Sequence, residues 1–210
     1  TDGVLIDTNT EKVVAKAKAL TTKHDLRVGI EACIDSLEIK DTSNIKMVSL
    51  STTLATNAVV ENRCGKTGLI LVGDRLRENM PTEYIEIISG EADIKGNVFV
   101  PISEKEAAAA VNKLKKKVDA IAISAYASVR NPQEELRIKR IVEANTELPV
   151  FCAHELAGSL GYAERTTTAV LNAGLIGIIN DFLTATKESL KNKNINAEIM
   201  IVKSDGNLMR

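Results

Sequence analysis

Residues 162–176 have the sequence YAERTTTAVLNAGLI, and HELAGSL at residues 154–160 leads into them. Apolar and small residues recur there at helical spacing, at Ala169, Val170, Ala173, Ile176 and Gly177. This spacing predicts a long helix over residues 163–192. We expect the rest of the chain to be organised around this helix.

A line of polar side chains runs along the predicted helix. Arg165, Thr168 and Asn172 lie three and four residues apart, so they share one helix face. A polar line on an otherwise apolar helix indicates either a satisfied contact between helices or the wall of a site. The residues alone favour the first interpretation.

Composition argues against several kinds of partner. The net charge is −1, from 27 basic and 28 acidic residues, which gives no reason to expect nucleic acid or an anionic membrane. Apolar residues make up 44% of the chain and aromatics 3%, so Ile, Val, Leu and Ala must build the core. No apolar run approaches the ~20 residues of a membrane span, and we expect no signal peptide. Cys33, Cys64 and Cys152 are widely spaced, which favours reduced thiols and a cytoplasmic location.

The first 60 residues alternate strand and helix signals. We predict strands at 4–6 (buried), 13–17 and 45–50, and helices at 26–37 and from residue 54. The first two strands form a hairpin around turn residues 7–10. Thr52 and Thr53 stand at the second helix start, where free N–H groups and hydroxyls can bind an anion. A plain N-cap is the simpler interpretation.

The tripeptide Gly65-Lys66-Thr67 is similar to the end of a phosphate-binding P-loop. That loop needs a glycine five positions before its last glycine, and Val60 stands there. Lys66 also precedes a predicted strand at residues 67–72, whereas a P-loop lysine begins a helix. We therefore predict a turn.

The middle of the chain predicts a parallel sheet. Strands are predicted at 67–72, 119–124 and 149–152. One helix is predicted at 103–116, where Ser103 and Glu106 form a capping box. A second helix is predicted from Asn131-Pro132, with the proline at its first position. This βαβαβ order implies parallel strands with right-handed crossovers. Residues 73–100 are less regular, with short strands at 84–88 and 97–100, and suggest an insertion or a lid.

A last strand is predicted at residues 196–202, followed by Ser204-Asp205-Gly206. An Asp-Gly turn is a good backbone bend. It follows the carboxyl end of a parallel strand, which is where ligands bind in open α/β sheets.

Several segments resemble the N-terminal region of the hydantoinase A / 5-oxoprolinase / acetone carboxylase family. They are STTLATNAVVE at 51–61, AIAIS at 120–124 with Asn131-Pro132 and Glu135, HEL at 154–156, ERTTTAVLNA at 164–173 and SDG at 204–206. The resemblance implies an α/β fold of the actin and sugar-kinase (ribonuclease H-like) type, with a mixed, largely parallel sheet and flanking helices. It also implies an N-terminal α/β region at 1–160 and, at 161–210, a linking helix and the start of the hydantoinase A domain.

The resemblance implies an ATP-dependent hydrolase that opens a cyclic amide, of hydantoin or 5-oxoproline type, through a phosphorylated intermediate. ATP and Mg²⁺, or another divalent metal, would be its cofactors. The alternatives are a subunit of an acetone-carboxylase-like enzyme and a non-catalytic ATP-binding protein of the same fold. We expect the chain to be inactive alone, truncated at both ends, and to need the C-terminal part of the same protein or a second subunit in an oligomer.

The resemblance also carries over site residues, although the family's opening Asp-x-Gly-Gly-Thr-Phe-Thr-Asp hairpin survives only as Thr1-Asp2, and Asn207 replaces a usual glycine. The residues implied to bind ATP are Thr1, Asp2, Thr52, Thr53, Ser204, Asp205 and Gly206, and Asp2 is also implied to bind the metal. The residues implied to bind substrate are Asn57, Arg165 and Asn172. Those implied in catalysis are Asp2, His154 and Arg165. Arg165 can instead form an ion pair with Glu164 or Glu155. His154 can instead make a structural hydrogen bond at the end of its strand.

Overall fold

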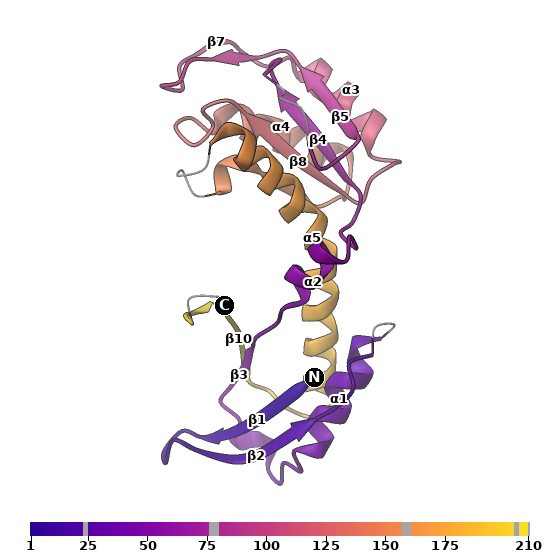
Figure 1. Cartoon of the computed structure of the whole chain (residues 1–210), viewed down its shortest axis with the longest axis vertical. Coiled ribbons are helices and arrows are strands. Elements are labelled where there is room, and N and C mark those ends of the chain that lie inside the picture. The colour runs from indigo at the N-terminus through magenta and orange to yellow at the C-terminus, as the bar shows by residue number, and fades with distance from the viewer. Residues whose placement is uncertain (23–24, 76–79, 157–160, 204–205, 210) are drawn as a thin grey trace. The chain divides into compact units, whose positions relative to one another are not determined.

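The computed structural model describes residues 1–22, 25–75, 80–156, 161–203 and 206–209 (Figure 1). The chain divides into two compact units, each with its own sheets. Unit 1 comprises Thr1–Leu54 and Ile179–Arg210, and unit 2 comprises Ala55–Ile178. Three antiparallel strand pairs and four parallel pairs confirm the predicted α/β class with mixed, largely parallel sheets.

Unit 1 begins with the predicted hairpin. Strands β1 (Asp2–Asp7) and β2 (Lys12–Lys18) are antiparallel, and helix α1 (Leu26–Ser36), capped by Asp25, packs on one face of them. The packing is close, because a Cβ on Gly3 would lie 2.7 Å from Cys33 Sγ. The predicted burial of residues 4–6 is wrong at Val4 and Ile6, which are 53% and 56% exposed. Their side chains point to the hairpin face opposite α1, and sequence cannot show that this face lacks a covering layer.

The second sheet of unit 1 pairs segments that are far apart in the sequence. Strand β3 (Met47–Leu50), which follows the 3₁₀ turn η1 (Thr42–Asn44), is parallel to β10 (Glu198–Val202). Strand β11 (Leu208–Met209) adds to β10 antiparallel. Both β3 and β10 begin two residues later than predicted.

Unit 2 contains the predicted parallel sheet. Its strand order is β5 (Tyr84–Ile88), β4 (Thr67–Val72), β8 (Ala120–Ala125), β9 (Val150–Cys152). Because β5 is an edge strand of this sheet, the interpretation of residues 73–100 as an insertion or lid is wrong for this part. The short strands β6 (Glu91–Ala92) and β7 (Val98–Val100) form a separate antiparallel pair.

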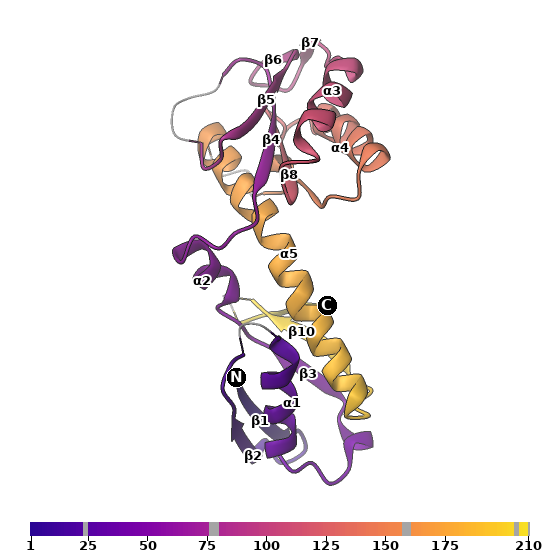
Figure 2. The same ribbon diagram turned by 90° about the vertical axis from the view of Figure 1, so that its right-hand side faces the viewer.

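Both faces of the unit 2 sheet are covered (Figure 2). Helices α3 (Glu104–Leu114) and α4 (Gln133–Asn145) pack on one face, and the first half of helix α5 (Tyr162–Asn192) packs on the other. Successive residues of β4 alternate between the two cores, as a strand requires: Ile70 contacts the first core, Leu69 and Leu71 the second. This accounts for the continuously apolar strand sequences.

The predicted helix starts are correct in place but not in every detail. Ser103 caps α3 by accepting from the Glu106 N–H at 3.3 Å, whereas the Glu106 carboxylate bonds Ser89 instead of reaching back. Only half of the predicted capping box is therefore formed. Pro132 is the N-cap of α4 rather than its first residue, and Asn131 Oδ1 accepts from the Gln133 N–H.

The rejection of a P-loop is confirmed. Helix α2 (Leu54–Val60) ends before Gly65-Lys66, and these two residues lead directly into β4. The Gly65 N–H donates to the carbonyl oxygen of Gly174 on α5 at 2.9 Å. A Cβ on Gly174 would lie 2.9 Å from the Gly65 oxygen, so this close approach of helix and turn needs glycine.

Helix α5 spans 31 residues, one more than predicted because it begins at Tyr162, and it belongs to unit 2 at its start and to unit 1 at its end. By length and composition alone it could cross a membrane, contrary to the expectation that no apolar run approaches that size. Its apolar residues Ala169, Val170 and Ala173 are buried against the unit 2 sheet, and 28% of the apolar window is buried in all. Gly177, expected on the same stripe, is exposed.

Candidate functional site

The carboxyl edge of the unit 2 sheet gathers the polar groups best placed to meet a ligand. Strands β4, β8 and β9 are parallel, so their carboxyl ends share one edge, which is where open α/β sheets bind ligands. The segments that leave these ends carry Arg75, Tyr126 and His154.

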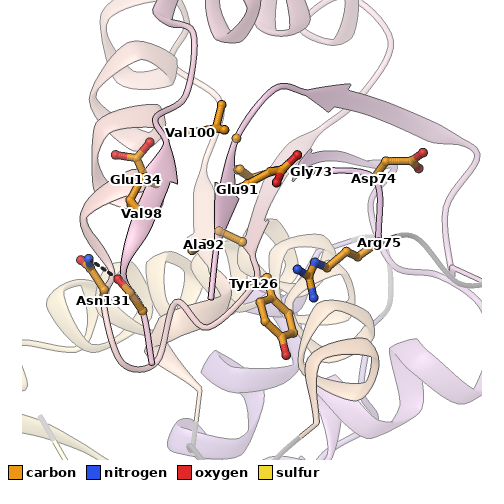
Figure 3. A pocket seen from close by; sticks show the side chains of 14 residues that line it. Gly73, Asp74, Arg75, Glu91, Ala92, Val98, Val100, Tyr126, Asn131 and Glu134 are labelled. Carbon is orange, nitrogen blue, oxygen red and sulfur yellow. Dashed lines mark hydrogen bonds between the residues drawn. The ribbon is translucent and has the colours of Figure 1, made fainter. Parts of the chain in front are cut away.

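A pocket of ≈ 220 Å³ lies beside the ends of β4 and β8 (Figure 3). Gly73 and Gly90 form part of its wall. Gly73 has a φ of +79°, and a Cβ there would lie 2.8 Å from the Gly90 oxygen, so two backbone segments meet at a spacing that only glycine permits. The volume is below the roughly 300–1,000 Å³ of sites for drug-sized ligands, and therefore suits a small molecule better than a nucleotide.

An aromatic contact connects the pocket to α5. The Arg75 guanidinium carbon lies 4.0 Å from the centre of the Tyr126 ring, a cation–π contact. Tyr126 in turn meets Tyr162 edge to face, with ring centres 5.5 Å apart. Burial raises the pKa of Tyr162 to about 12, so its phenol is protonated at neutral pH and cannot act there as a base.

The polar groups of the pocket divide into two kinds. Glu134 and Asn131 are structural: Glu134 accepts from the Ile102 N–H at 2.6 Å and pairs with Arg137, and Asn131 Nδ2 donates to Gly96 O. The carboxylates of Asp74 and Glu91 have no hydrogen bond or ion pair with any residue that the structure describes. Within the described part of the chain, the pocket therefore offers two uncommitted carboxylates and the Arg75 guanidinium.

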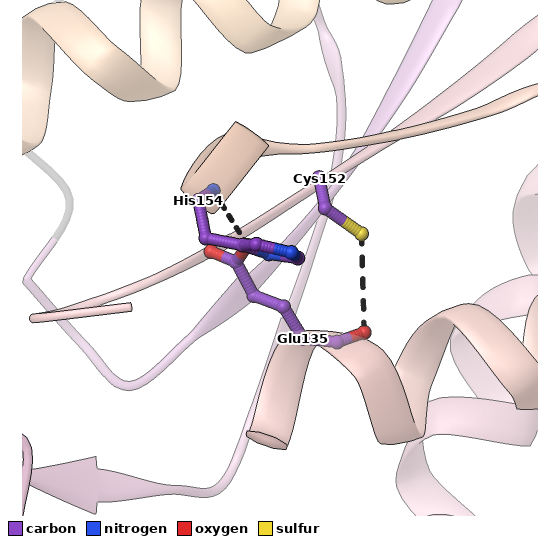
Figure 4. Close-up of side chains that lie close together, drawn as sticks. All are labelled: Glu135, Cys152 and His154. Carbon is purple, nitrogen blue, oxygen red and sulfur yellow. Dashed lines mark hydrogen bonds and ion pairs between the residues drawn. The ribbon is translucent and has the colours of Figure 1, made fainter. Parts of the chain in front are cut away.

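A second group of side chains, Glu135, Cys152 and His154, lies at the same edge (Figure 4). His154 sits in the 3₁₀ turn η2 (Ala153–Glu155) that follows β9. Glu135, in the first turn of α4, is 0% exposed. Its Oε1 accepts from the Ala125 N–H at 2.8 Å, and its Oε2 meets the His154 N–H at 2.9 Å and His154 Nδ1 at 2.7 Å. The predicted structural hydrogen bond of His154 is thus present.

These three side chains also have the ligand atoms of a metal site, all within 4.8 Å of one another. One observation makes a metal unfavourable. The Glu135 oxygens already serve three donors, which a metal would displace.

The residues expected to bind ATP and metal lie mostly in unit 1. The Thr1 nitrogen donates to Ala19 O and Thr21 Oγ1, and the exposed Asp2 pairs with Lys18 at 3.3 Å. Thr52 Oγ1 accepts at 3.0 Å from the N–H of Leu54, the first residue of α2, so its hydroxyl is bonded at the helix start. Thr53 is exposed beside it.

The turn after β10 is described only in part. The Gly206 N–H donates to Lys203 O, and Gly206 has a φ of +82°. Ser204 and Asp205 lie outside the described residues, so the expected cradle at 204–206 stays a prediction.

The residues expected to contact substrate lie in unit 2. Asn57 is exposed on α2, whereas Arg165 on α5 is 3% exposed, with its guanidinium carbon 5.8 Å from the Tyr162 ring centre. Asn172 Nδ2 donates to Thr168 O, one turn earlier in the same helix. The interpretation of Asn172 as satisfied within the fold therefore has direct support.

The ion pair considered for Arg165 with Glu155 is not formed. Glu155 pairs instead with Lys139 at 3.3 Å. Arg165 is buried beside Thr166, whose Oγ1 meets Ser124 Oγ at 2.7 Å and so joins α5 to β8.

Arg75, Glu91 and Tyr126 are site candidates that were not predicted from the sequence. Arg75 and Tyr126 directly follow strands that were predicted correctly, so the rule that ligands bind at carboxyl ends could have found them. Glu135 belongs to a segment that carries the family resemblance, but nothing in the sequence indicates that its carboxylate, rather than that of Glu134, is the fully buried one.

A parallel sheet between helices, with a pocket and a buried carboxylate–imidazole pair at its carboxyl edge, places this chain among the open α/β domains, a class that binds ligands at that edge. The protein-family model described as "Hydantoinase/oxoprolinase N-terminal region" matches residues 1–146, and the family model described as "Hydantoinase/oxoprolinase" matches residues 165–210. The chain belongs to the hydantoinase/oxoprolinase family, which confirms the resemblance noted in its sequence.

Two characterised relatives share much of the chain. It is 25% identical to the acetophenone carboxylase gamma subunit of Aromatoleum aromaticum, over 90% of this chain and 32% of that protein. It is 28% identical to the caprolactamase subunit alpha of Pseudomonas jessenii, over 79% of this chain and 28% of that protein.

Two solved structures resemble the whole chain. The ATP-dependent caprolactamase of Pseudomonas jessenii has a TM-score of 0.75 at 26% identity, over 99% of this chain and 34% of that chain. A nucleotide-free structure of acetone carboxylase, from work on ATP-dependent acetone carboxylation, has a TM-score of 0.81 over 99% of this chain and 35% of that chain. Because the sequence identity is 18%, this likeness shows the fold alone. The chain thus spans about a third of the length of these proteins or less.

Proposed function

We propose that this chain is part of an ATP-dependent enzyme that opens a cyclic amide of hydantoin, 5-oxoproline or related lactam type. The observation that carries the proposal is the likeness of the whole chain to an ATP-dependent caprolactamase, at 26% identity and a TM-score of 0.75. Caprolactam is itself a cyclic amide. A pocket of ≈ 220 Å³ at the carboxyl edge of unit 2 is compatible with a small ring.

The chemistry explains why ATP is needed. An amide carbonyl is a poor electrophile, and its nitrogen is a poor leaving group. Transfer of the ATP γ-phosphoryl to the amide oxygen makes the ring carbon susceptible to water. Mg²⁺ and oriented donors would neutralise the charge on the transferred group.

In this proposal the predicted residues keep their roles. Asp2 would bind the metal, and the phosphates would be bound by Thr1, Asp2, Thr52, Thr53, Ser204, Asp205 and Gly206. Substrate would be bound by Asn57, Arg165 and Asn172, with Asp2, His154 and Arg165 in catalysis. The domains would be residues 1–160 and 161–210, in a cytoplasmic oligomer completed by further parts of the same protein or a second subunit.

A second candidate is a subunit of an ATP-dependent carboxylase. It is supported by the 90% of this chain that matches the acetophenone carboxylase gamma subunit. Both candidates activate a carbonyl compound with ATP, and they differ in whether water or a carbon centre then forms the new bond. A non-catalytic ATP-binding role is the third candidate.

The test is phosphate release from ATP and Mg²⁺ by the full-length protein, with 5-oxoproline, hydantoin, caprolactam or acetone added, and with the 210-residue chain as the blank. The proposal expects release stimulated by one cyclic amide, with ring-opened product formed in equal amount. Stimulation by acetone only after partner chains are added would favour the carboxylase. ATP binding without stimulated release would favour the third candidate.

A further inference from the structure

The Glu135–His154 pair makes one hydrogen bond more than is needed to hold the backbone. The Glu135 carboxylate already ties the end of β8 and the turn η2 to α4 through two backbone N–H groups, of Ala125 and His154. Those two bonds satisfy one lone pair on each oxygen of a fully buried carboxylate. The bond to the imidazole is additional, and it constrains the His154 ring rather than the backbone.

This additional bond sets the tautomer of His154. When ionised, the Glu135 carboxylate can only accept, and the hydrogen in the 2.7 Å contact then comes from Nδ1; the opposite direction requires a protonated carboxyl. A neutral imidazole with its hydrogen on Nδ1 has a free lone pair on Nε2. The His154 side chain is 17% exposed while Glu135 is 0% exposed, so the imidazole is the accessible member of the pair.

Of the ionisable side chains around the His154 ring, Glu135 is the one that bonds to it. Cys152 on β9 is 0% exposed, and its Sγ lies 4.0 Å from the Glu135 carbonyl oxygen. Burial raises the pKa of Cys152 to about 12, so it is a neutral thiol at physiological pH. Lys139 on α4 and Glu155 on η2 pair with each other at 3.3 Å. Among the described residues, Glu135 is the charged side chain hydrogen-bonded to the imidazole.

We propose that His154 Nε2 is a proton-transfer site for a phosphorylated cyclic amide, and that Glu135 is its positioning residue. This rests on the function proposed above. As the water oxygen bonds to the ring carbon, the water proton passes to Nε2 and the electron pair of the C=N bond moves to the ring nitrogen. Nε2 then gives the proton to that nitrogen. The C–N single bond breaks with its electron pair on the amine, which takes the hydroxyl proton as the carbonyl forms, and a second water displaces phosphate from the resulting acyl phosphate. Glu135 compensates the positive charge of the intermediate imidazolium, as carboxylates do in catalytic triads.

The activity test uses the full-length protein with three substitutions. His154→Asn keeps a donor near the Nδ1 position but removes Nε2, so we expect kcat for amide-stimulated phosphate release to fall roughly 10²- to 10⁴-fold, with KM little changed. Glu135→Gln is expected to lower kcat about 10²-fold or more, because a carboxamide can donate to Nδ1 and reverse the tautomer. Glu143→Gln makes the same change at an exposed position of α4 and should leave kcat unchanged. A His154→Asn enzyme with wild-type kcat overturns the proposal.

A second arm does not depend on activity. Nitrogen NMR of the imidazole rings in the 210-residue chain reports the tautomer directly, and because the chain has two histidines, the His154→Asn spectrum assigns the signals. We expect the Nδ1–H form for His154 and a shift to the Nε2–H form in Glu135→Gln. The Nε2–H form or a mixture in the wild type overturns the inference. A wild type with the expected tautomer but no stimulated phosphate release would overturn the proposed function instead, and with it the catalytic step.

Discussion

The sheets of units 1 and 2 differ in how far their apolar strand residues are buried, and the β1–β2 hairpin also carries charged residues that β4 and β8 lack. In unit 2, β4 and β8 are buried along their whole length, because α3 and α4 cover one face and α5 the other. In unit 1, α1 covers one face of the β1–β2 hairpin, and Val4 and Ile6 are more than half exposed. The comparison teaches that apolar composition sets which elements form, whereas the layers around them set how much each apolar side chain stabilises the fold.

The largest contrast should come from matched truncations of isoleucine. Ile123→Ala, in a fully buried position of β8, should cost about 2–5 kcal/mol of unfolding free energy through lost burial and a cavity. Ile6→Ala, at a 56% exposed position, should cost less than about 1 kcal/mol. Amide hydrogen exchange, followed separately in β8 and β1, measures both. Equal losses would show that the hairpin is covered in solution.

Gly174→Ala tests the close contact between α5 and the turn before β4. The new Cβ would lie 2.9 Å from the Gly65 oxygen and 2.9 Å from Thr67 Oγ1, so we expect a net loss of about 1–3 kcal/mol despite the better helix propensity of alanine. Gly177→Ala is the control, because nothing lies within 4 Å of a Cβ there, and it should be neutral or stabilising. A stabilising Gly174→Ala would contradict the contact. Denaturant titration is the measurement.

Alkaline pH should destabilise unit 2 more than unit 1. Burial raises the pKa of Cys152 from 9.0 to about 12 and that of Tyr162 from 10.0 to about 12. Both groups are neutral in the fold and ionise more easily when unfolded, so their stabilisation is complete below pH 9 and is lost as pH rises toward 12. The slope is at most about 1.4 kcal/mol per pH unit for each group.

The double variant Cys152→Ala with Tyr162→Phe provides the control for this pH dependence. Thermal unfolding between about pH 8 and pH 11 should show a flatter decline for the variant than for the wild type, since the two titrating groups are gone. Identical slopes would mean that other groups govern the alkaline response.

The smallest effect is expected at the junction of α1 and the end of α5 within unit 1. Arg27 Nη1 and Glu188 Oε2 are 3.2 Å apart, with side chains 50% and 51% exposed. Such pairs contribute little, so Glu188→Gln should change the stability of unit 1 by less than about 0.5 kcal/mol. A loss above 1.5 kcal/mol, measured by hydrogen exchange in α1, would make this pair a main attachment of the helix.

Sequence predicted the elements well and their surroundings poorly. The strands at Thr67–Val72 and Tyr84–Ile88 were predicted at their observed bounds, because β-branched apolar runs between turns have few alternatives. The burial of Val4 could not be predicted, because it depends on which layers cover the hairpin.

The candidate site also combines a residue that local sequence indicated with a residue whose role depends on the fold. His154 was identified at a strand end from its local sequence. Its partner Glu135 could not be distinguished from Glu134, because both occupy the first turn of one predicted helix. The fold turns Glu134 toward Ile102 and Glu135 toward Ala125 and His154, and those partners come from separate parts of the chain.

The interrupted course of unit 1 along the chain also imposes an order on biosynthesis. Thr1–Leu54 leave the ribosome before unit 2, but β3 has no parallel partner until β10 is translated, after all of unit 2. At about 5–20 residues per second the nascent hairpin and β3 must wait on the order of 10 s. Unit 2, which is continuous in sequence, can fold during that interval. The exposed edge of β3 is therefore the part of the nascent chain that most needs protection by chaperones.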